Sequence, residues 1–593
     1  MTDNRVWKLP ESAPDPAELA AAWSRVVENG LAAIQAGNRA GAGAPFDPTA
    51  PARAMFDFTA QLWSNPMAVL QASQAAANEW MNLWGAAARR AAGAEVEPVI
   101  APERGDRRFG DPAWSEDPAF DYLKQAYLLA SRQATALVEQ AEGIDEATRT
   151  RAAFFTQAYL NALSPANFAF TNPEAIRRAI DTGSISLLSG LANLLADAAT
   201  DAKLPQRRAS AAFALGEDIA VTPGQVVFQN ALIQLIHYAP TTETVFRRPL
   251  LYVPPLVNKY YLLDLQPKSS LIRWLVEQGH SLFVISWINP GPELADKGLA
   301  DYLELGPIAA LDAIKQATGE READLFGFCM GGTIAAIAAA LLAARGQGGR
   351  VASLTTIGSM FDFANMGQWA TFTEPAQLAA LEKHLEAKGV MAAHELQTLF
   401  SVVRANDLIW SSVVSHYLLD KEAPPSDILH WFADGANIPA AFLLDWTSHI
   451  LKDNALTRSG ALTIGADAID LGRIEAPALV ISLKDDHVSA WQATYDGAKL
   501  LGGETRFLLG GSGHNAGVIN PPSANKHGYW TNPDMPATAE TWLDGATRHE
   551  GSWWPEWQAW LVREQGDQVP ARVPGKGKLK AIEPAPGSYV RMR

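Results

Sequence analysis

The chain has 593 residues, a formal net charge of -16 and 48% apolar residues. The length predicts more than one domain, and the negative charge argues against a nucleic-acid partner, which would need a basic face. Because Cys329 is the only cysteine, no intrachain disulfide can form and nothing requires an oxidising compartment. The sequence opens without a signal segment, and no stretch approaches the roughly 20 apolar residues that span a bilayer. We therefore expect a cytoplasmic protein without a membrane span.

Residues 1–205 are predicted to form a mostly helical N-terminal domain. Apolar residues recur at helical spacing over 16–35, 56–92 and 120–141, with a Gly/Ala/Pro linker at 40–51. The first 100 residues are rich in alanine and poor in β-branched residues, so we expect them to be loosely packed or partly mobile. Two interpretations stay open for this domain: an accessory layer, or an interaction surface for a partner or an apolar product.

Residues 206–593 alternate short apolar runs with helix-like segments, a pattern typical of a parallel sheet with crossover helices. A strand pair is predicted within 225–238, and single strands at 250–253, 281–287, 323–329, 351–357, 476–483 and 505–509. The spacing breaks once, between about 361 and 471, where a long helix-rich segment carries several tryptophans. We interpret this insertion as a helical cap or lid above the active site.

The sequence around Cys329 predicts a nucleophile. Residues 327–332 read Gly-Phe-Cys-Met-Gly-Gly, between an apolar strand-like run and the alanine-rich, helix-like run 333–344. Strand, sharp turn and helix around G-x-C-x-G is the nucleophile elbow of an α/β-hydrolase fold, with cysteine in place of serine. The alternative is a small buried apolar cysteine in a tight turn.

A cysteine nucleophile needs a base and a group that orients the base, which this fold supplies in the order nucleophile, acid, histidine. Asp486 follows the strand predicted at 476–483, and His514 lies in a glycine-rich loop after the next strand. We therefore predict a triad of Cys329, Asp486 and His514, in which His514 takes the thiol proton and Asp486 holds the imidazole. Asp485 is the alternative acid; His487 is a weaker candidate for the base because it lies on the acid's loop.

The developing oxyanion needs two backbone donors. The Met330 amide, just past the nucleophile, should be one. The other should come from the loop after strand 250–253, where we choose Val257, with Leu256 second. A thiolate exchanges acyl groups with thioesters at little energetic cost, so cysteine favours acyl transfer from a CoA-like thioester. No metal and no cofactor are expected; coenzyme A would be part of the substrate and a product.

Several motifs together resemble the poly(3-hydroxyalkanoate) synthases. They are the stretch 327–333, Val-Pro-Pro at 253–255 with Asn-Lys-Tyr-Tyr at 258–261 and Leu-Asp-Leu-Gln-Pro at 263–267, Ser-Gly-His at 512–514 with 517–522, Gly-Ser-Trp-Trp-Pro at 551–555, and the terminal 582–590. The likeness runs from about Asn167 to the C-terminus. The chain length and the Gly-Phe-Cys-x-Gly-Gly stretch are similar to those of class I synthases, the single-subunit type. Leu256 and Met330 depart from the pattern of relatives, which bears on side-chain specificity.

The resemblance implies a Cys/His/Asp triad on Cys329, His514 and Asp486. It implies polymerisation of short-chain (R)-3-hydroxyacyl-CoA, such as 3-hydroxybutyryl-CoA, into an insoluble polyester with release of CoA. It also implies a homodimer on cytoplasmic polyester granules, near granule-associated proteins. The alternatives are a thioesterase or polyester depolymerase of the same fold, and a non-catalytic granule-binding protein.

Overall fold

The computed structural model describes residues 15–37, 45–63, 66–103, 105–200, 213–422 and 424–593. The chain divides into two compact units. We call the first the helical unit; it comprises Met1–Ala209, Gln368–Ala380 and Gln397–Pro424. We call the second the sheet unit; it comprises Ser210–Gly367, Leu381–Leu396 and Pro425–Arg593. Of the first 100 residues, for which we predicted mobility, 1–14, 38–44 and 64–65 lie outside the described residues.

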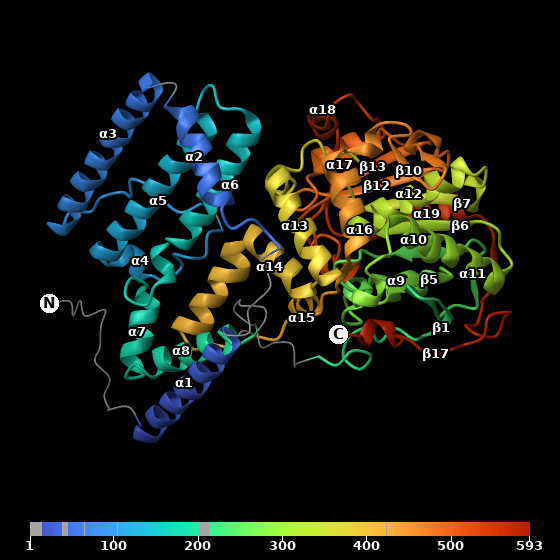
Figure 1. Ribbon diagram of the computed structural model, residues 1–593, viewed down its shortest axis with the longest axis horizontal. Coiled ribbons are helices and arrows are strands. Elements are labelled where there is room, and N and C mark those ends of the chain that lie inside the picture. The colour runs from blue at the N-terminus through green and yellow to red at the C-terminus, as the bar shows by residue number, and fades with distance from the viewer. Residues whose placement is uncertain (1–14, 38–44, 64–65, 104, 201–212, 423) are drawn as a thin grey trace. The chain divides into compact units, whose positions relative to one another are not determined.

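The helical unit carries the predicted N-terminal helices (Figure 1). They are α1 (Pro16–Gly37), α2 (Ala50–Leu62), α3 (Pro66–Ala91), α4 (Ala113–Glu116), α5 (Pro118–Gln140), α6 (Glu146–Ala162), α7 (Pro173–Asp181) and α8 (Ile185–Ala198). Polar side chains fix where several of them begin. Asp117 accepts hydrogen bonds from the amides of Ala119 and Phe120 at the start of α5, and Asp145 accepts one from Thr148 at the start of α6. Such caps satisfy amides that lack a partner in the first helical turn.

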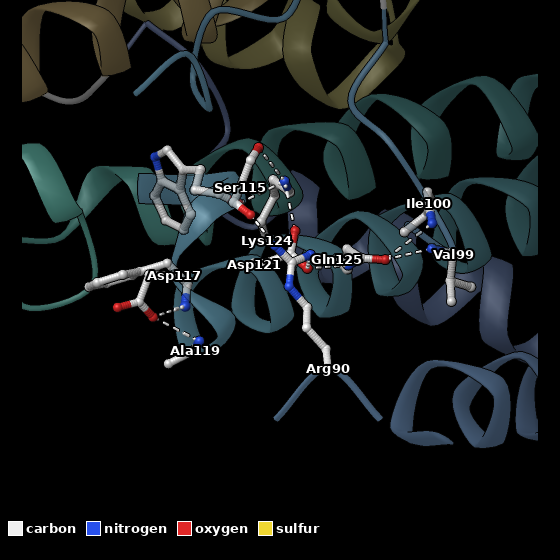
Figure 2. A network of polar contacts seen from close by, with 11 residues as sticks. Arg90, Val99, Ile100, Ser115, Asp117, Ala119, Asp121, Lys124 and Gln125 are labelled. Carbon is white, nitrogen blue, oxygen red and sulfur yellow. Dashed lines mark hydrogen bonds and ion pairs between the residues drawn. The ribbon is translucent and has the colours of Figure 1, made fainter. Parts of the chain in front are cut away.

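A buried polar network joins three stretches of the helical unit (Figure 2). Asp121, on α5, accepts Arg90 of α3 at 2.7 Å, Lys124 at 3.0 Å and Gln125 at 2.7 Å. Lys124 also donates to the Trp114 carbonyl of α4 at 2.7 Å. Since a buried charge is tolerated only when it is paired and hydrogen-bonded, this network fixes α3 and α4 against α5.

The sheet unit is built on one 11-stranded sheet, in the order β15-β14-β13-β12-β7-β6-β4-β5-β2-β1-β17. The six strands from β13 to β5 in that order are parallel, and the strands on both flanks pair antiparallel. Their bounds are β1 (Gly224–Gln229), β2 (Ile233–Tyr238), β4 (Leu250–Val253), β5 (Leu282–Trp287), β6 (Ala323–Phe328), β7 (Val351–Ile357), β12 (Ala478–Leu483), β13 (Thr505–Gly510), β14 (Tyr529–Thr531), β15 (Thr547–His549) and β17 (Glu583–Pro584). All the strands predicted from the sequence are present.

Among the described residues, three short strand pairs lie outside this sheet: β3 (Thr244–Phe246) with β16 (Gln568–Pro570), β8 (Val390–Met391) with β9 (Ile438–Pro439), and β10 (Leu462–Ile464) with β11 (Asp467–Ile469). The sheet unit also holds the helices α9 (Leu271–Glu277), α10 (Leu299–Leu303), α11 (Ala309–Thr318), α12 (Met330–Ala344), α15 (Asp427–Ala433), α16 (Ala440–Asp445), α17 (Trp491–Ala498), α18 (Ala539–Asp544) and α19 (Trp554–Gln565). Helix α12 is buried on all sides from Gly331 to Leu342, which is why its sequence is almost wholly alanine, isoleucine and leucine.

The segment between β7 and β12, predicted to be a cap insertion over 361–471, is rich in helices but belongs to both units. It contains α13 (Pro375–Lys388), α14 (Ala393–Val403), α15, α16 and π-helical stretches at Asn406–Trp410, Val413–Leu418 and Trp446–Lys452. Its parts Gln368–Ala380 and Gln397–Pro424 cluster with the helical unit, and the rest with the sheet unit.

Across the described ranges, no single helix combines the length and apolar composition needed to cross a membrane. Helices α7 and α8 meet that criterion only as a pair, with a bend of 112° between them.

Candidate active site

Cys329 lies on the sharp turn between β6 and α12, at the carboxyl edge of the parallel strands. Its backbone has φ 53° and ψ -132°, a region that residues with a side chain rarely adopt. Two hydrogen bonds hold it there: the Cys329 amide donates to the Ile357 carbonyl at 2.8 Å, and its carbonyl accepts from the Gly332 amide at 3.0 Å. The turn thus presents the sulfur from a strained position, as the elbow pattern predicts, and Cys329 stays partly exposed.

The glycines around the turn are required by close approach. A Cβ on Gly331 would lie 2.2 Å from the Val253 carbonyl oxygen, and one on Gly332 would lie 2.1 Å from the Ser359 hydroxyl. Any side chain at these positions would push apart the elbow and the ends of the neighbouring strands. The loop after β4 is consequently in direct backbone contact with the first turn of α12. This loop is the stretch from which we predicted the second oxyanion donor.

His514 and Asp486 meet at the same edge of the sheet. His514 lies in the loop after β13 and Asp486 in the loop after β12. Nδ1 of His514 is 2.6 Å from Oδ2 of Asp486. The other carboxylate oxygen, Oδ1, accepts the amides of Val488 at 2.7 Å and Ser489 at 2.9 Å. The carboxylate is therefore fixed on both sides, and it leaves Nε2 of the imidazole for the thiol. The structure places Asp486, and not the exposed Asp485, against the histidine; His487 is also exposed.

The acid loop and the histidine loop are tied to each other through their backbones. The Lys484 amide donates to the Gly510 carbonyl at 2.8 Å, and the Asp485 amide donates to the Ser512 carbonyl at 3.0 Å. The first bond lies at the last pair of β12 with β13, and the second extends the parallel pairing past the ends of both strands. The two loops are therefore joined directly to each other through their backbones.

The electrostatics of the site favour a charged imidazole. Burial by itself lowers the pKa of His514, but the Asp486 carboxylate and the neighbouring Cys329 side chain, through electrostatic interactions and hydrogen bonds, raise that pKa to about 10. The raised pKa favours the imidazolium form, which can stabilise negative charge on the sulfur and give a proton to a leaving group. The Phe328 ring packs on the imidazole with ring centroids 4.8 Å apart and helps to exclude water.

Two tryptophans at the start of α19 are hydrogen-bonded to the loop that carries His514. Trp553 Nε1 donates to the Gly517 carbonyl at 2.9 Å, and Trp554 Nε1 donates to the Val518 carbonyl at 3.0 Å. Ser552 Oγ donates to the Asn520 carbonyl. The Gly-Ser-Trp-Trp-Pro stretch therefore supports the loop that carries His514.

Gly358 is a site residue that sequence reasoning missed. It follows β7 with φ +55°, and a Cβ there would lie 3.2 Å from His514 Cε1 and 3.4 Å from Asp486 Oδ2. The only sequence signal is a glycine directly after an apolar run, which many strand ends share. Its place under the histidine–aspartate pair becomes visible only once β7 is known to lie between β6 and β12.

Replacing Gly358 with alanine is expected to lower the catalytic rate by about 10-fold or more, because the added methyl group displaces the imidazole. The positive φ should also cost about 1–3 kcal/mol of unfolding free energy. Gly346→Ala is the matched control: its φ is +69° and nothing lies within 4 Å of the added Cβ. Thermal unfolding and steady-state rates of both variants check this. Equal rates for the two variants would show that crowding at His514 has no role.

The predicted oxyanion donors come from the elbow and from the loop after β4. Met330 is the first residue of α12, and Val257 is partly exposed in the segment 254–259. Leu256, the second choice, is buried at 4% exposure. The close approach of Gly331 to Val253 and Pro254 brings the two stretches together. Within the described residues, no group of three or more His, Cys, Asp or Glu side chains is arranged to hold a metal ion.

Comparison with known proteins matches two families along the chain. The family described as poly-beta-hydroxybutyrate polymerase (PhaC) N-terminus matches residues 105–275, and the alpha/beta hydrolase fold matches 248–521. The predicted α/β-hydrolase fold is therefore confirmed. A monoacylglycerol lipase of Paleococcus ferrophilus is a solved structure with 14% identity and a TM-score of 0.30, covering 48% of this chain and 90% of its own.

Curated relatives match almost the whole chain. A poly(3-hydroxyalkanoate) polymerase of Methylorubrum extorquens is 40% identical over 90% of this chain and 89% of its own. The poly(3-hydroxyalkanoate) polymerase subunit PhaC of Cupriavidus necator is 41% identical over 82% of this chain and 83% of its own. The fold is thus that of an α/β hydrolase, and relatives named as polymerases place the chain among acyltransferase-type enzymes of this fold. The chain belongs to the poly(3-hydroxyalkanoate) polymerase family, as its motifs indicated.

Proposed function

We propose that this protein polymerises short-chain (R)-3-hydroxyacyl-CoA, such as 3-hydroxybutyryl-CoA, into a polyester through a covalent acyl-Cys329 intermediate. The observation that carries the proposal is the strained Cys329 beside a buried His514–Asp486 pair with a 2.6 Å contact. Family membership supports polyester synthesis as the outcome.

The chemistry proceeds in two transfers. The Cys329 sulfur attacks the thioester carbonyl, and the negative charge on its oxygen is met by the amides of Met330 and Val257. The C–S bond to CoA then breaks, and the His514 imidazolium gives its proton to the departing thiolate, which leaves free CoA and an acyl-enzyme. The neutral imidazole next takes the proton of a 3-hydroxyl group as that oxygen attacks the acyl-enzyme. An ester forms, and the Cys329 sulfur leaves as an anion beside the imidazolium.

Chain growth requires that a hydroxyl group reach the acyl-enzyme before water does. Trp431 of α15 is 3% exposed and belongs to the same apolar cluster against which Cys329 packs. Apolar side chains that cover an acyl-enzyme lower the access of water to it. We propose that this part of the segment between β7 and β12 shields the acyl-enzyme.

Incubation with 3-hydroxybutyryl-CoA distinguishes polymerisation from hydrolysis. A polymerase releases CoA and makes the solution turbid, whereas a thioesterase of the same fold releases CoA with soluble 3-hydroxybutyrate. Prior alkylation of Cys329 with iodoacetamide should abolish CoA release, and a non-catalytic granule protein would release none before or after alkylation. Stoichiometric soluble acid without polymer would overturn the proposal.

We propose that the protein acts as a homodimer on cytoplasmic polyester granules, near granule-associated proteins. The helical unit supports contact with an apolar surface, because Trp23, Val27 and Leu31 recur on one side of α1 and are 52%, 58% and 58% exposed. In the same incubation the enzyme should sediment with the polymer. Protein that stays in the supernatant would contradict the granule location.

A further inference from the structure

The loop that follows β4 is fixed on both sides of its proposed oxyanion donor. We call residues 254–259 the oxyanion loop. Trp287 Nε1, at the end of β5, donates to the Pro254 carbonyl at 2.9 Å, and the Ala436 amide donates to the Val257 carbonyl at 3.0 Å. The Leu256–Val257 peptide, whose N–H is the proposed donor, lies between these two held carbonyls.

The second half of the oxyanion loop is tied to the stretch that runs from α15 to Gly435. Asn258 and Gly435 form an isolated antiparallel bridge. Trp431 Nε1 donates to the Lys259 carbonyl at 2.7 Å, and Asn258 Nδ2 lies 3.4 Å from the Phe432 carbonyl oxygen. This stretch is about 170 residues away in sequence, so its hydrogen bonds to the oxyanion loop form only in the folded protein.

The Lys259 side chain joins this contact to the end of the chain. It is 5% exposed, and its ammonium group donates to Asp434 Oδ1 at 2.6 Å and to the Met592 carbonyl at 3.0 Å. The remaining oxygen of Asp434, Oδ2, accepts the hydroxyl of Tyr261 at 2.8 Å. A buried ammonium group with these partners has one favourable position, since any other leaves a charge unpaired away from water.

We propose that Lys259 is a positioning residue for acyl transfer, which holds the Val257 amide in register with the Met330 amide through Asp434 and the Met592 carbonyl. The inference rests on the proposed function of the site. Lys259 lies two residues from Val257 and contacts neither Cys329 nor His514 among the interactions of the described residues. Its loss should therefore alter the oxyanion geometry without altering the nucleophile.

Two reactions of the same sulfur separate these effects. Acylation by 3-hydroxybutyryl-CoA builds an oxyanion and needs both amides, whereas alkylation by iodoacetamide displaces iodide and builds none. Lys259→Met should slow the acylation burst of CoA release by about 10- to 100-fold, with kcat falling and KM little changed. The alkylation rate should stay within about 2-fold of wild type. Lys259→Arg keeps the charge and should recover part of the acylation rate.

Lys268→Met is the matched control, because Lys268 is an exposed lysine of the same sheet unit; both rates should equal those of wild type. Should Lys259→Met fail to fold, Asp434→Asn tests the same contact with a nearly isosteric change. An unchanged acylation rate, or an equal fall in acylation and alkylation, would overturn the positioning role. Wild-type enzyme that releases no CoA would instead refute the proposed function itself.

Discussion

Replacing Cys329 with alanine is expected to lower the rate of CoA release by about 10⁴-fold or more, because no acyl-enzyme can form without the sulfur. The apolar alanine leaves the rest of the site in place, so substrate should still bind. Stopped-flow measurement of CoA release gives the rate, and mass spectrometry of the quenched enzyme shows whether one acyl group is attached. Wild type should carry that group and the variant should not.

The fold should survive this substitution, although alanine at φ 53° stays strained as cysteine was. Circular dichroism and thermal unfolding close to wild type would establish that the loss is chemical. Because Cys329 is the only cysteine, any acyl thioester on the enzyme has to involve it. A variant that still forms polymer at more than about one hundredth of the wild-type rate would exclude covalent catalysis by this residue.

The central strands were predictable because their sequence carries the reason for their burial. Strands β4 and β7 coincide with the predicted 250–253 and 351–357, each rich in the apolar and β-branched residues of a strand covered on both faces. The elbow was predictable for a similar reason, because the sharp turn requires small residues within six positions of Cys329. Such short-range constraints can be recognised directly in the sequence.

The short outer strands β14, β15 and β17 and the division of the insertion were not predictable in this way. Strand β17 is two residues long and pairs with β1 across more than 350 positions, through Gln225 with Pro584 and Val226 with Glu583. Nothing periodic marks so short a strand. The stretches 368–380 and 397–424 belong to the helical unit although the chain around them belongs to the sheet unit. Only tertiary packing decides that membership.

The site shows the same limit at the level of single residues. Chain order indicated that an acid after β12 should face His514. It could not decide between Asp485 and Asp486, because both follow the strand directly and neighbouring side chains point in different directions. The structure separates them because the Asp486 carboxylate caps the amides of Val488 and Ser489, while Asp485 is exposed. The role proposed for Lys259 could not be predicted from the sequence, since its partners Asp434 and Met592 lie far along the chain.

Asp486→Asn should produce the second large effect, a fall of about 10³- to 10⁴-fold in the rate of CoA release. The amide is nearly isosteric with the carboxylate, but it removes the negative charge that most raises the pKa of His514. The imidazole pKa should therefore fall, and the proton for departing CoA becomes scarcer at neutral pH. Unchanged CoA release in this variant would show that Asp486 does not orient or charge the histidine.

The positive charge of protonated His514 should also make the free energy of unfolding depend on pH. In the folded protein the pKa of His514 is raised to about 10, above its ordinary value of 6.5. Protonated His514 thus contributes stability that is fully present below pH 6.5 and is lost as pH rises toward 10, on the order of a few kcal/mol in total. Urea unfolding of wild type and Asp486→Asn at pH 6, 8 and 10 measures this contribution. The stability advantage of wild type should shrink with each step, and an advantage that grows with pH would mean that the imidazole is neutral in the folded protein.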